Sequence, residues 1–213
     1  AGVAGCSFVN NILGLDAAGR PATPITTYAD TRSAAMVPGL RADFDETQAH
    51  QRTGCLFHPS YLPARLRWMA QARSEWLGNS ARWVSLGEYL ELRLFGQAAV
   101  SYSAAAWTGL LDRRRLCWDQ PLLAGLPIAV EQLSPLVDVS AARRGRRTEI
   151  AVRWPALAQV PWFPLVGDGA AANVGSGCVT PQRVAVSMGT TTALRAVTGD
   201  ADFVVPAGLW CYR

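Results

Sequence analysis

The sequence predicts an α/β fold for this chain of 213 residues, because strand-like segments at both of its ends enclose consecutive helical stretches. Apolar or alternating runs at residues 1–6, 12–16 and 25–29 are typical of strands. From about residue 45 the apolar residues recur at helical spacing, and alternation returns after residue 180. A chain of this length can bury a substantial core as one domain.

The opening strands are predicted to form a hairpin. The run Ile12–Asp16 leads into Ala17–Pro21, whose glycine and proline indicate a turn, and Ile25–Ala29 returns as the second strand. This arrangement brings Asn10 and the polar segment Tyr28–Ser33 to one edge of the hairpin.

The next part of the chain is predicted to be helical. Its helical stretches are Glu46–Arg52, Pro63–Leu77 and Leu86–Phe95. Together they are interpreted as a helical insertion or layer that covers about residues 45–97. Trp68, Trp76 and Trp83 are spaced like residues of the core and of helix packing, and this interpretation is favoured over an aromatic ligand box.

The segment after this layer contains a cluster of arginines. A helix is expected at Gln120–Ala124, and strands are expected at Ser134–Val139 and Glu149–Val152. Between these strands, Arg143–Arg147 holds four arginines around one glycine, a pattern that invites a nucleic-acid interpretation. Because the net charge is only +4 and no wider basic stripe is present, a solvated hairpin tip is favoured.

The composition excludes several kinds of chemistry within this chain. All 20 cationic side chains are arginine, so neither a Schiff-base lysine nor the lysine of a Walker phosphate loop is available. The five cysteines are far apart and form no C-x-x-C pair, which indicates no disulfide framework or zinc site and fits a reducing cytoplasm. Cys55 and His58 can be written as a hydrolase dyad, but closeness in sequence is poor evidence for geometry. No apolar run approaches the roughly 20 residues of a membrane span.

Two segments near the end carry candidate chemistry. Asp168 lies between Gly167 and Gly169, where substrate can approach the backbone closely, and the small residues that follow suit a helix start. Further along, Gly189–Thr191 ends the alternating run Val184–Met188, and its N–H groups and hydroxyls can bind a phosphate. A carboxylate for the acceptor hydroxyl and a donor-rich loop for the phosphates are what a phosphoryl-transfer site needs.

Seven motifs occur in a fixed order along the chain. They are Tyr28–Ser33, Arg52–Gly54 with His58–Pro59, Gly87–Leu90, Ser101–Ser103, Thr108–Asp112, Gly167–Gly169 and Gly189–Thr191. In this order they resemble the FGGY family of carbohydrate kinases, and within it the gluconokinase-type members. The resemblance runs essentially from end to end of the chain.

The resemblance implies a ribonuclease H-like domain of the actin-like ATPase kind, with a mixed sheet, flanking helices and the helical insertion. Residues 1–213 then make up most of the N-terminal, sugar-binding domain of the family. The first phosphate loop and the C-terminal nucleotide domain are expected to lie outside the chain, so the chain alone is expected to be inactive. The implied reaction is ATP-dependent phosphorylation of a hydroxyl of a sugar or sugar acid, with gluconate preferred and with Mg²⁺ as the metal.

The resemblance also implies residue roles. Asp168 is the general base for the sugar hydroxyl, and Gly189, Thr190 and Thr191 hold the transferring phosphates. The substrate-binding residues that it assigns are Asn10, Tyr28, Asp30, Arg32 and His58. The guanidinium fork of Arg32 suits an aldonate carboxylate. No metal ligand is assigned within the chain beyond Asp168 as a candidate.

Other interpretations stay open from the sequence. Asp30 can instead be a strand-end residue that caps a helix, Arg32 can form an ion pair at the surface, and His58 can be a packed loop residue. The acceptor can be xylulose, ribulose or glycerol, because Asn10 departs from the residue that some relatives carry against the sugar. A non-catalytic sugar-binding or regulatory module is the alternative to a kinase. The expected partner is a small sugar or sugar acid in the cytoplasm, with no nucleic acid and no membrane, and a homodimer is left open.

Overall fold

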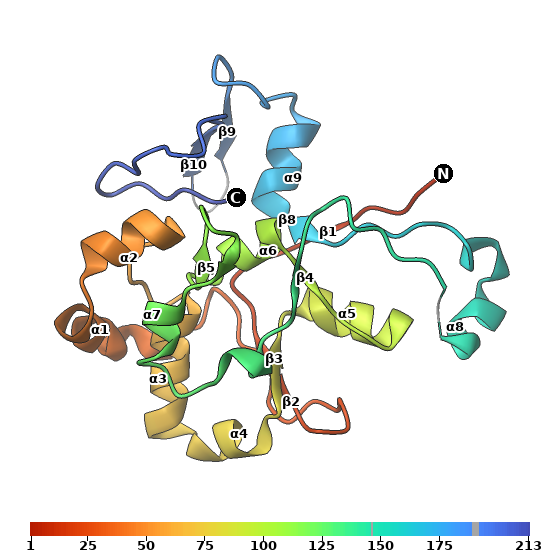
Figure 1. Ribbon diagram of the computed structural model, residues 1–213, viewed down its shortest axis with the longest axis horizontal. Helices are drawn as coiled ribbons and strands as arrows, with labels where there is room; N and C mark the ends of the chain where they lie inside the picture. The colour runs from red at the N-terminus through yellow and green to blue at the C-terminus, as the bar shows by residue number, and fades with distance from the viewer. Residues whose placement is uncertain (146, 189–191) are drawn as a thin grey trace.

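The computed structural model describes residues 1–145, 147–188 and 192–213 and has the predicted α/β character (Figure 1). The helices are α1 (Val37–Asp43), α2 (Glu46–Thr53), α3 (Leu62–Ala72), α4 (Ser74–Asn79), α5 (Leu86–Phe95), α6 (Tyr102–Ala106), α7 (Gln120–Leu123), α8 (Thr148–Arg153) and α9 (Asp168–Gly175). The strands are β1 (Cys6–Ser7), β2 (Leu13–Leu15), β3 (Arg82–Val84), β4 (Val100–Ser101), β5 (Leu111–Asp112), β6 (Cys117–Trp118), β7 (Leu136–Val137), β8 (Val166–Gly167), β9 (Val184–Met188) and β10 (Thr192–Ala196). Short 3₁₀ turns occupy Arg32–Met36, Val130–Gln132 and Pro155–Leu157.

The strands of the described residues pair as five two-stranded ladders rather than as one continuous sheet. β1 with β8 and β4 with β7 are parallel, and the other three pairs are antiparallel. Both orientations expected of a mixed sheet are therefore present, in short pieces. The β1–β8 pair joins the beginning of the chain to the segment that leads into α9.

The opening hairpin is present only in part. The turn predicted at residues 17–21 forms, with Gly19 in the left-handed region at φ +74°. The strand predicted for residues 25–29 is wrong, because only Thr26 makes a bridge there. Pro24 has no amide hydrogen to donate to a ladder, which limits strand pairing in this segment.

Two of the three helices predicted for the middle of the chain are confirmed, as α2 and α5. The third, Pro63–Leu77, is divided into α3 and α4 by Arg73, whose backbone lies at φ −150° and ψ 50°. α5 begins with a reciprocal capping box, in which the side chains of Ser85 and Glu88 each accept a backbone N–H of the other residue. This cap fixes the start of α5 at the residue that the helical spacing predicted.

The tryptophans of the helical layer pack as predicted. Trp83 is 1% exposed in the main core cluster. Trp68 and Trp76 lie edge to face, with ring centroids 5.9 Å apart, and pack against the same cluster. Within the described residues, none of the helices is long and apolar enough to cross a bilayer.

The structure corrects the prediction for the arginine cluster. The predicted strand Glu149–Val152 lies within α8, where Glu149 in the first turn and Arg153 in the last turn complement the helix dipole. Arg143 does not belong to a hairpin tip either, because it bridges the backbone of Trp162. Arg146 lies outside the described residues.

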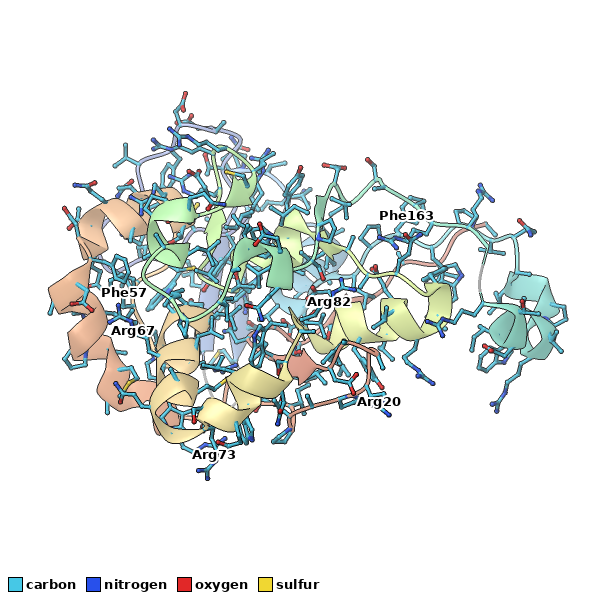
Figure 2. All side chains as sticks on the ribbon, turned by 60° about the horizontal axis from the view of Figure 1, so that its bottom comes forward. Arg20, Phe57, Arg67, Arg73, Arg82 and Phe163 are labelled. Atoms are coloured by element: carbon cyan, nitrogen blue, oxygen red, sulfur yellow. The ribbon has the colours of Figure 1, made fainter. Side chains whose placement is uncertain are left out.

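Side-chain contacts join the helices around the core. Arg67 of α3 lies 2.6 Å from Asp43 of α1 and stacks over the ring of Phe44, and it is labelled beside Phe57 in Figure 2. Arg73, at the break between α3 and α4, lies at the outer edge of the molecule in the same view. Arg67 therefore joins α3 to α1, while Arg73 faces the outside of the helical layer.

α9 and the β9–β10 hairpin lie on the same side of the molecule, next to α6 and β8 (Figure 1). The strand predicted at Val184–Met188 is confirmed as β9, and Met188 pairs with Thr192 of β10. The segment after β10 returns to α2, where the side chain of Gln51 exchanges two hydrogen bonds with the backbone of Val205. Asp168, the candidate catalytic carboxylate, lies on this side of the domain.

Candidate functional site

Asp168 is placed where the sequence predicted a catalytic carboxylate. β8 runs directly into α9, and Asp168 is the first residue of that helix. Its side chain is exposed, and Oδ1 accepts the N–H of Gly169 at 2.8 Å. The predicted helix start is confirmed. A carboxylate fixed at this point can accept a proton from a bound hydroxyl.

Trp107 supports the turn that carries Asp168. A Cβ built on Gly167 would lie 2.8 Å from Nε1 of Trp107, and one built on Gly169 would lie 3.2 Å from its Cζ2. The two glycines therefore allow the indole ring to lie directly against the backbone on both sides of Asp168. The sequence analysis missed Trp107, although it directly precedes the Thr108–Asp112 motif.

The side chains of Trp107, Tyr212 and Tyr61 form an aromatic wall next to the Asp168 turn. Tyr212 stacks on Trp107 with ring centroids 3.6 Å apart and an interplanar angle of 16°. The hydroxyls of Tyr212 and Tyr61 are hydrogen-bonded at 2.5 Å. Burial raises the pKa of both phenols, so each stays protonated at neutral pH. Tyr61 precedes α3, and the wall thus connects the Asp168 turn to the start of that helix.

Arg65 of α3 gathers the segments that the sequence assigned to sugar binding. It is 2% exposed, and its guanidinium donates to the carbonyl of Asn10 at 2.7 Å and to that of Thr27 at 2.5 Å. Desolvation lowers the pKa of Arg65 to about 10, partly offset by the charge of Asp30, so it stays charged at neutral pH. Arg65 was not predicted as a site residue, because no polar motif surrounds it in the sequence of α3.

Asp30 and Arg32 are bound to each other. Nη2 of Arg32 lies 2.6 Å from Oδ2 of Asp30, and Nε lies 2.9 Å from Oδ1. The guanidinium also lies over Trp68, 4.2 Å from the ring centroid. The hydrogen bond from Arg32 lowers the pKa of Asp30, which stays ionised. The fork of Arg32 is therefore occupied in this state, and its role toward a substrate carboxylate stays a prediction.

Asn10 and His58 lie near the same end of α3. Asn10 has a left-handed backbone, at φ 56°, and its Oδ1 is buried without a hydrogen-bond partner among the described residues. Nδ1 of His58 accepts the N–H of Ser60 at 3.2 Å, and Oγ of Ser60 donates to the carbonyl of Tyr28 at 3.4 Å. Desolvation, with the charge of Arg65 adding to it, lowers the pKa of His58. The side chain of Tyr28 is 61% exposed.

A cavity of about 40 Å³ connects these residues to the strand before Asp168. Its lining includes Asn10, Ser60, Trp107, Val166 and the buried Glu88. This volume holds a few water molecules or one hydroxyl group rather than a whole sugar. The unpartnered Oδ1 of Asn10 is therefore available to a polar group that enters the cavity.

The expected phosphate-binding residues Gly189, Thr190 and Thr191 lie outside the described residues. The strands on either side, β9 and β10, are paired up to Met188 and Thr192. The hairpin contacts α9 through Arg195, because a Cβ on Gly169 would lie 3.2 Å from its Nε. The β9–β10 hairpin therefore touches the Asp168 turn.

Cys55 and His58 do not form a dyad in the described structure. Cys55 is buried, and its Sγ lies 3.5 Å from the carbonyl of Ala106. Burial raises the pKa of its thiol to about 12.

Cys55 is therefore expected to resist thiol reagents in the folded protein at neutral pH, because only the thiolate reacts. Iodoacetamide labelling followed by mass spectrometry should modify the exposed Cys6 well before Cys55. In the unfolded chain, both should react at similar rates. Equal labelling of the two in the folded protein would contradict this assignment.

Metal ligands were also sought in the site. Among residues 1–145, 147–188 and 192–213, no three His, Cys, Asp or Glu side chains converge on a point that would hold a metal ion. Asp168 is the carboxylate at the Gly167–Gly169 turn. Mg²⁺ in phosphotransferases is typically held by one or two carboxylates together with the phosphates of the nucleotide.

Comparison with known proteins identifies the family. The profile of the N-terminal domain of the FGGY family of carbohydrate kinases matches residues 1–175. The chain belongs to the FGGY family. The family that the seven motifs indicated is therefore confirmed, and the match includes Asp30 and Asp168.

The relatives differ in their acceptors. The gluconokinase of Bacillus subtilis is 25% identical over 206 residues, which cover 97% of this chain and 40% of that protein. The xylulose kinase of Escherichia coli is 29% identical over 184 residues, covering 86% and 37%. A gluconate kinase structure from Lactobacillus acidophilus superimposes with a TM-score of 0.84 at 25% identity, over 92% of this chain and 40% of the other. The FGGY chain therefore spans about 40% of the length of the gluconokinase.

Proposed function

We propose that this FGGY chain is the acceptor-binding part of an ATP-dependent kinase that phosphorylates a hydroxyl of gluconate. The observation that carries the proposal is the contact between the hairpin that holds the Gly189–Thr191 segment and the turn that holds Asp168. The contact lies beside the exposed carboxylate of Asp168, and the strands of the hairpin flank the predicted phosphate-binding residues in the sequence. The family match supports a carbohydrate kinase, and the similarity to gluconokinases favours gluconate.

In the proposed reaction, Asp168 accepts the proton of the acceptor hydroxyl as its oxygen attacks the terminal phosphorus of ATP. Trp107 holds the Asp168 turn in place, so the carboxylate needs little reorganisation. Gly189, Thr190 and Thr191 hold the transferring phosphates. A bound Mg²⁺ would offset phosphate charge, and Asp168 is the candidate carboxylate for it within this chain.

The sugar is proposed to lie against the residues gathered by Arg65. Asn10 presents an unpartnered amide oxygen at the cavity, where one sugar hydroxyl can donate to it. Asp30 accepts further hydroxyl hydrogen bonds, while Tyr28 and His58 border the same segment. Arg32 receives the substrate carboxylate only if its bond to Asp30 rearranges.

We further propose the ribonuclease H-like arrangement, with residues 1–213 as most of the N-terminal domain and residues 45–97 as its helical insertion. A cytoplasmic location follows from the use of ATP, and a homodimer stays a prediction. Xylulose, ribulose or glycerol is the alternative acceptor, since xylulose and glycerol kinases are also similar to the chain. A non-catalytic sugar-binding or regulatory module is the alternative function.

The proposal is tested by ADP release from the full-length protein that carries this chain. Gluconate, xylulose, ribulose and glycerol are supplied as acceptors, each with ATP and Mg²⁺. We expect the highest kcat/KM with gluconate. A higher value with a neutral acceptor would move the assignment to that substrate, and no release with any acceptor would favour the non-catalytic module.

A further inference from the structure

Arg195 occupies the contact between the hairpin and the Asp168 turn. It lies on β10, opposite Ala185 of β9, and Nη1 donates to Oγ of Ser187 at 2.7 Å. Its Nε is the atom that a Cβ on Gly169 would meet at 3.2 Å. The guanidinium is thus held from the hairpin and lies against Gly169, the residue that follows Asp168.

Arg195 differs in its partners from the seven described arginines that form ion pairs. The arginines with a carboxylate at ion-pair distance are Arg20, Arg32, Arg41, Arg52, Arg67, Arg115 and Arg143. For Arg195, the described residues offer no carboxylate at that distance, and its hydrogen-bond partner is a neutral hydroxyl. Its side chain is half-buried, so its charge is less screened than that of a fully exposed arginine.

The charge of Arg195 also acts on the neighbouring wall. It lowers the pKa of Tyr212, although burial raises that pKa more. Arg195 thus lies between the Tyr212–Trp107 stack and the start of α9. Since the chain contains no lysine, a cation for phosphate in this part of the chain has to be arginine.

We propose that Arg195 is a catalytic residue that stabilises the negative charge of the transferring phosphoryl group. This inference deepens the proposed function and rests on it. In the proposed reaction, the acceptor oxygen that attacks the phosphorus lies within hydrogen-bond reach of Asp168. A guanidinium against Gly169 therefore lies close to the equatorial phosphoryl oxygens, on which charge gathers in the transition state.

The step itself is balanced as follows. The acceptor oxygen forms a bond to the terminal phosphorus of ATP, and its proton passes to the carboxylate of Asp168. The bond from that phosphorus to the bridging oxygen breaks, and its electron pair stays on ADP. Arg195 donates hydrogen bonds to the phosphoryl oxygens and neither gains nor loses a proton.

The test compares Arg195→Gln, Arg195→Lys and the control Arg183→Gln in the full-length protein. Arg183 is exposed and donates to the carbonyl of Gly177 at 3.4 Å. We expect Arg195→Gln to lower kcat by about 10²–10³-fold, the usual effect of removing one charge-stabilising donor, with little change in the KM of gluconate. Arg195→Lys should restore part of kcat, and the control should match the wild type.

Two results would overturn the proposal. An unchanged kcat in Arg195→Gln would exclude a role in the transition state. A raised KM for gluconate at constant kcat would show that Arg195 binds the sugar instead.

A binding experiment separates this proposal from the proposed function. Inorganic phosphate is titrated into the chain while the arginine Nε–H resonances are followed by NMR, with Arg195 assigned by the peak lost in Arg195→Gln. If the wild-type enzyme turns over no acceptor, the kinase assignment fails. The phosphate titration then decides whether Arg195 belongs to an anion-binding site. A saturable shift at Arg195 but not at Arg183 supports an anion site, and no shift overturns it.

Discussion

Asp168→Asn is expected to lower kcat for phosphoryl transfer by about 10²–10⁴-fold, the typical contribution of a positioned general base. Asparagine keeps the size and the hydrogen-bonding oxygen of the side chain but cannot take up the proton of the acceptor hydroxyl. The side chain is exposed at the start of α9 and accepts the N–H of Gly169, an interaction that the amide oxygen preserves. We therefore expect an unchanged melting temperature and a nearly unchanged KM for the sugar.

The matched control is Asp200→Asn, an exposed aspartate whose Oδ1 accepts the N–H of Asp202 in the segment after β10. It should leave kcat at the wild-type value. Coupled ADP release measures both variants, and circular dichroism verifies their folding. If Asp168→Asn keeps more than about a tenth of the wild-type kcat, Asp168 is not the base that such a reaction requires.

Asp119→Ala is expected to produce the largest loss of stability, about 3–5 kcal/mol, because it leaves the charge of Arg52 without its partner. The side chain of Asp119 is fully buried, and its Oδ2 lies 2.6 Å from Nε of Arg52, which is 28% exposed. The hydrogen bond from this arginine to Asp119 raises the pKa of Arg52, so Arg52 stays charged. Oδ1 of Asp119 also caps α7 by accepting the N–H of Leu122 at 2.9 Å.

Thermal unfolding checks this prediction. In a domain of this size, the expected loss corresponds to a fall in melting temperature of roughly 6–20 °C. Asp16→Ala is the comparison, because Asp16 pairs with an arginine, Arg20, that is 78% exposed, and exposed pairs add little. Its melting temperature should stay close to that of the wild type. Equal falls in melting temperature in Asp119→Ala and Asp16→Ala would show that burial of the aspartate does not determine the loss of stability.

The sequence predicted elements whose ends carry strong local signals. α5 was predicted from its helical spacing, and β9 from the alternation that ends at Met188. The break at Arg73 was missed because the apolar spacing continues across it. α8 was taken for a strand because the short apolar run Ile150–Val152 does not distinguish a strand from a helix, and the charged ends of α8 complement a helix dipole.

The candidate site could be predicted only where its residues belong to contiguous motifs. Asp168 between two glycines was visible, and so was the polar segment around Asp30. Arg65, Trp107 and Arg195 were not, because their roles depend on contacts between residues far apart in the chain. Arg65, for example, joins the carbonyls of Asn10 and Thr27 from a helix beyond both.

We propose that the Asp168 turn and the β9–β10 hairpin form a phosphotransfer centre for a sugar acid. The most direct test is transfer of the labelled terminal phosphate of ATP to gluconate by the full-length protein, with the product separated and identified by mass. We expect label in a gluconate phosphate with the wild-type protein and almost none with Asp168→Asn. Label found only in inorganic phosphate, or recovered entirely in ATP, would contradict it.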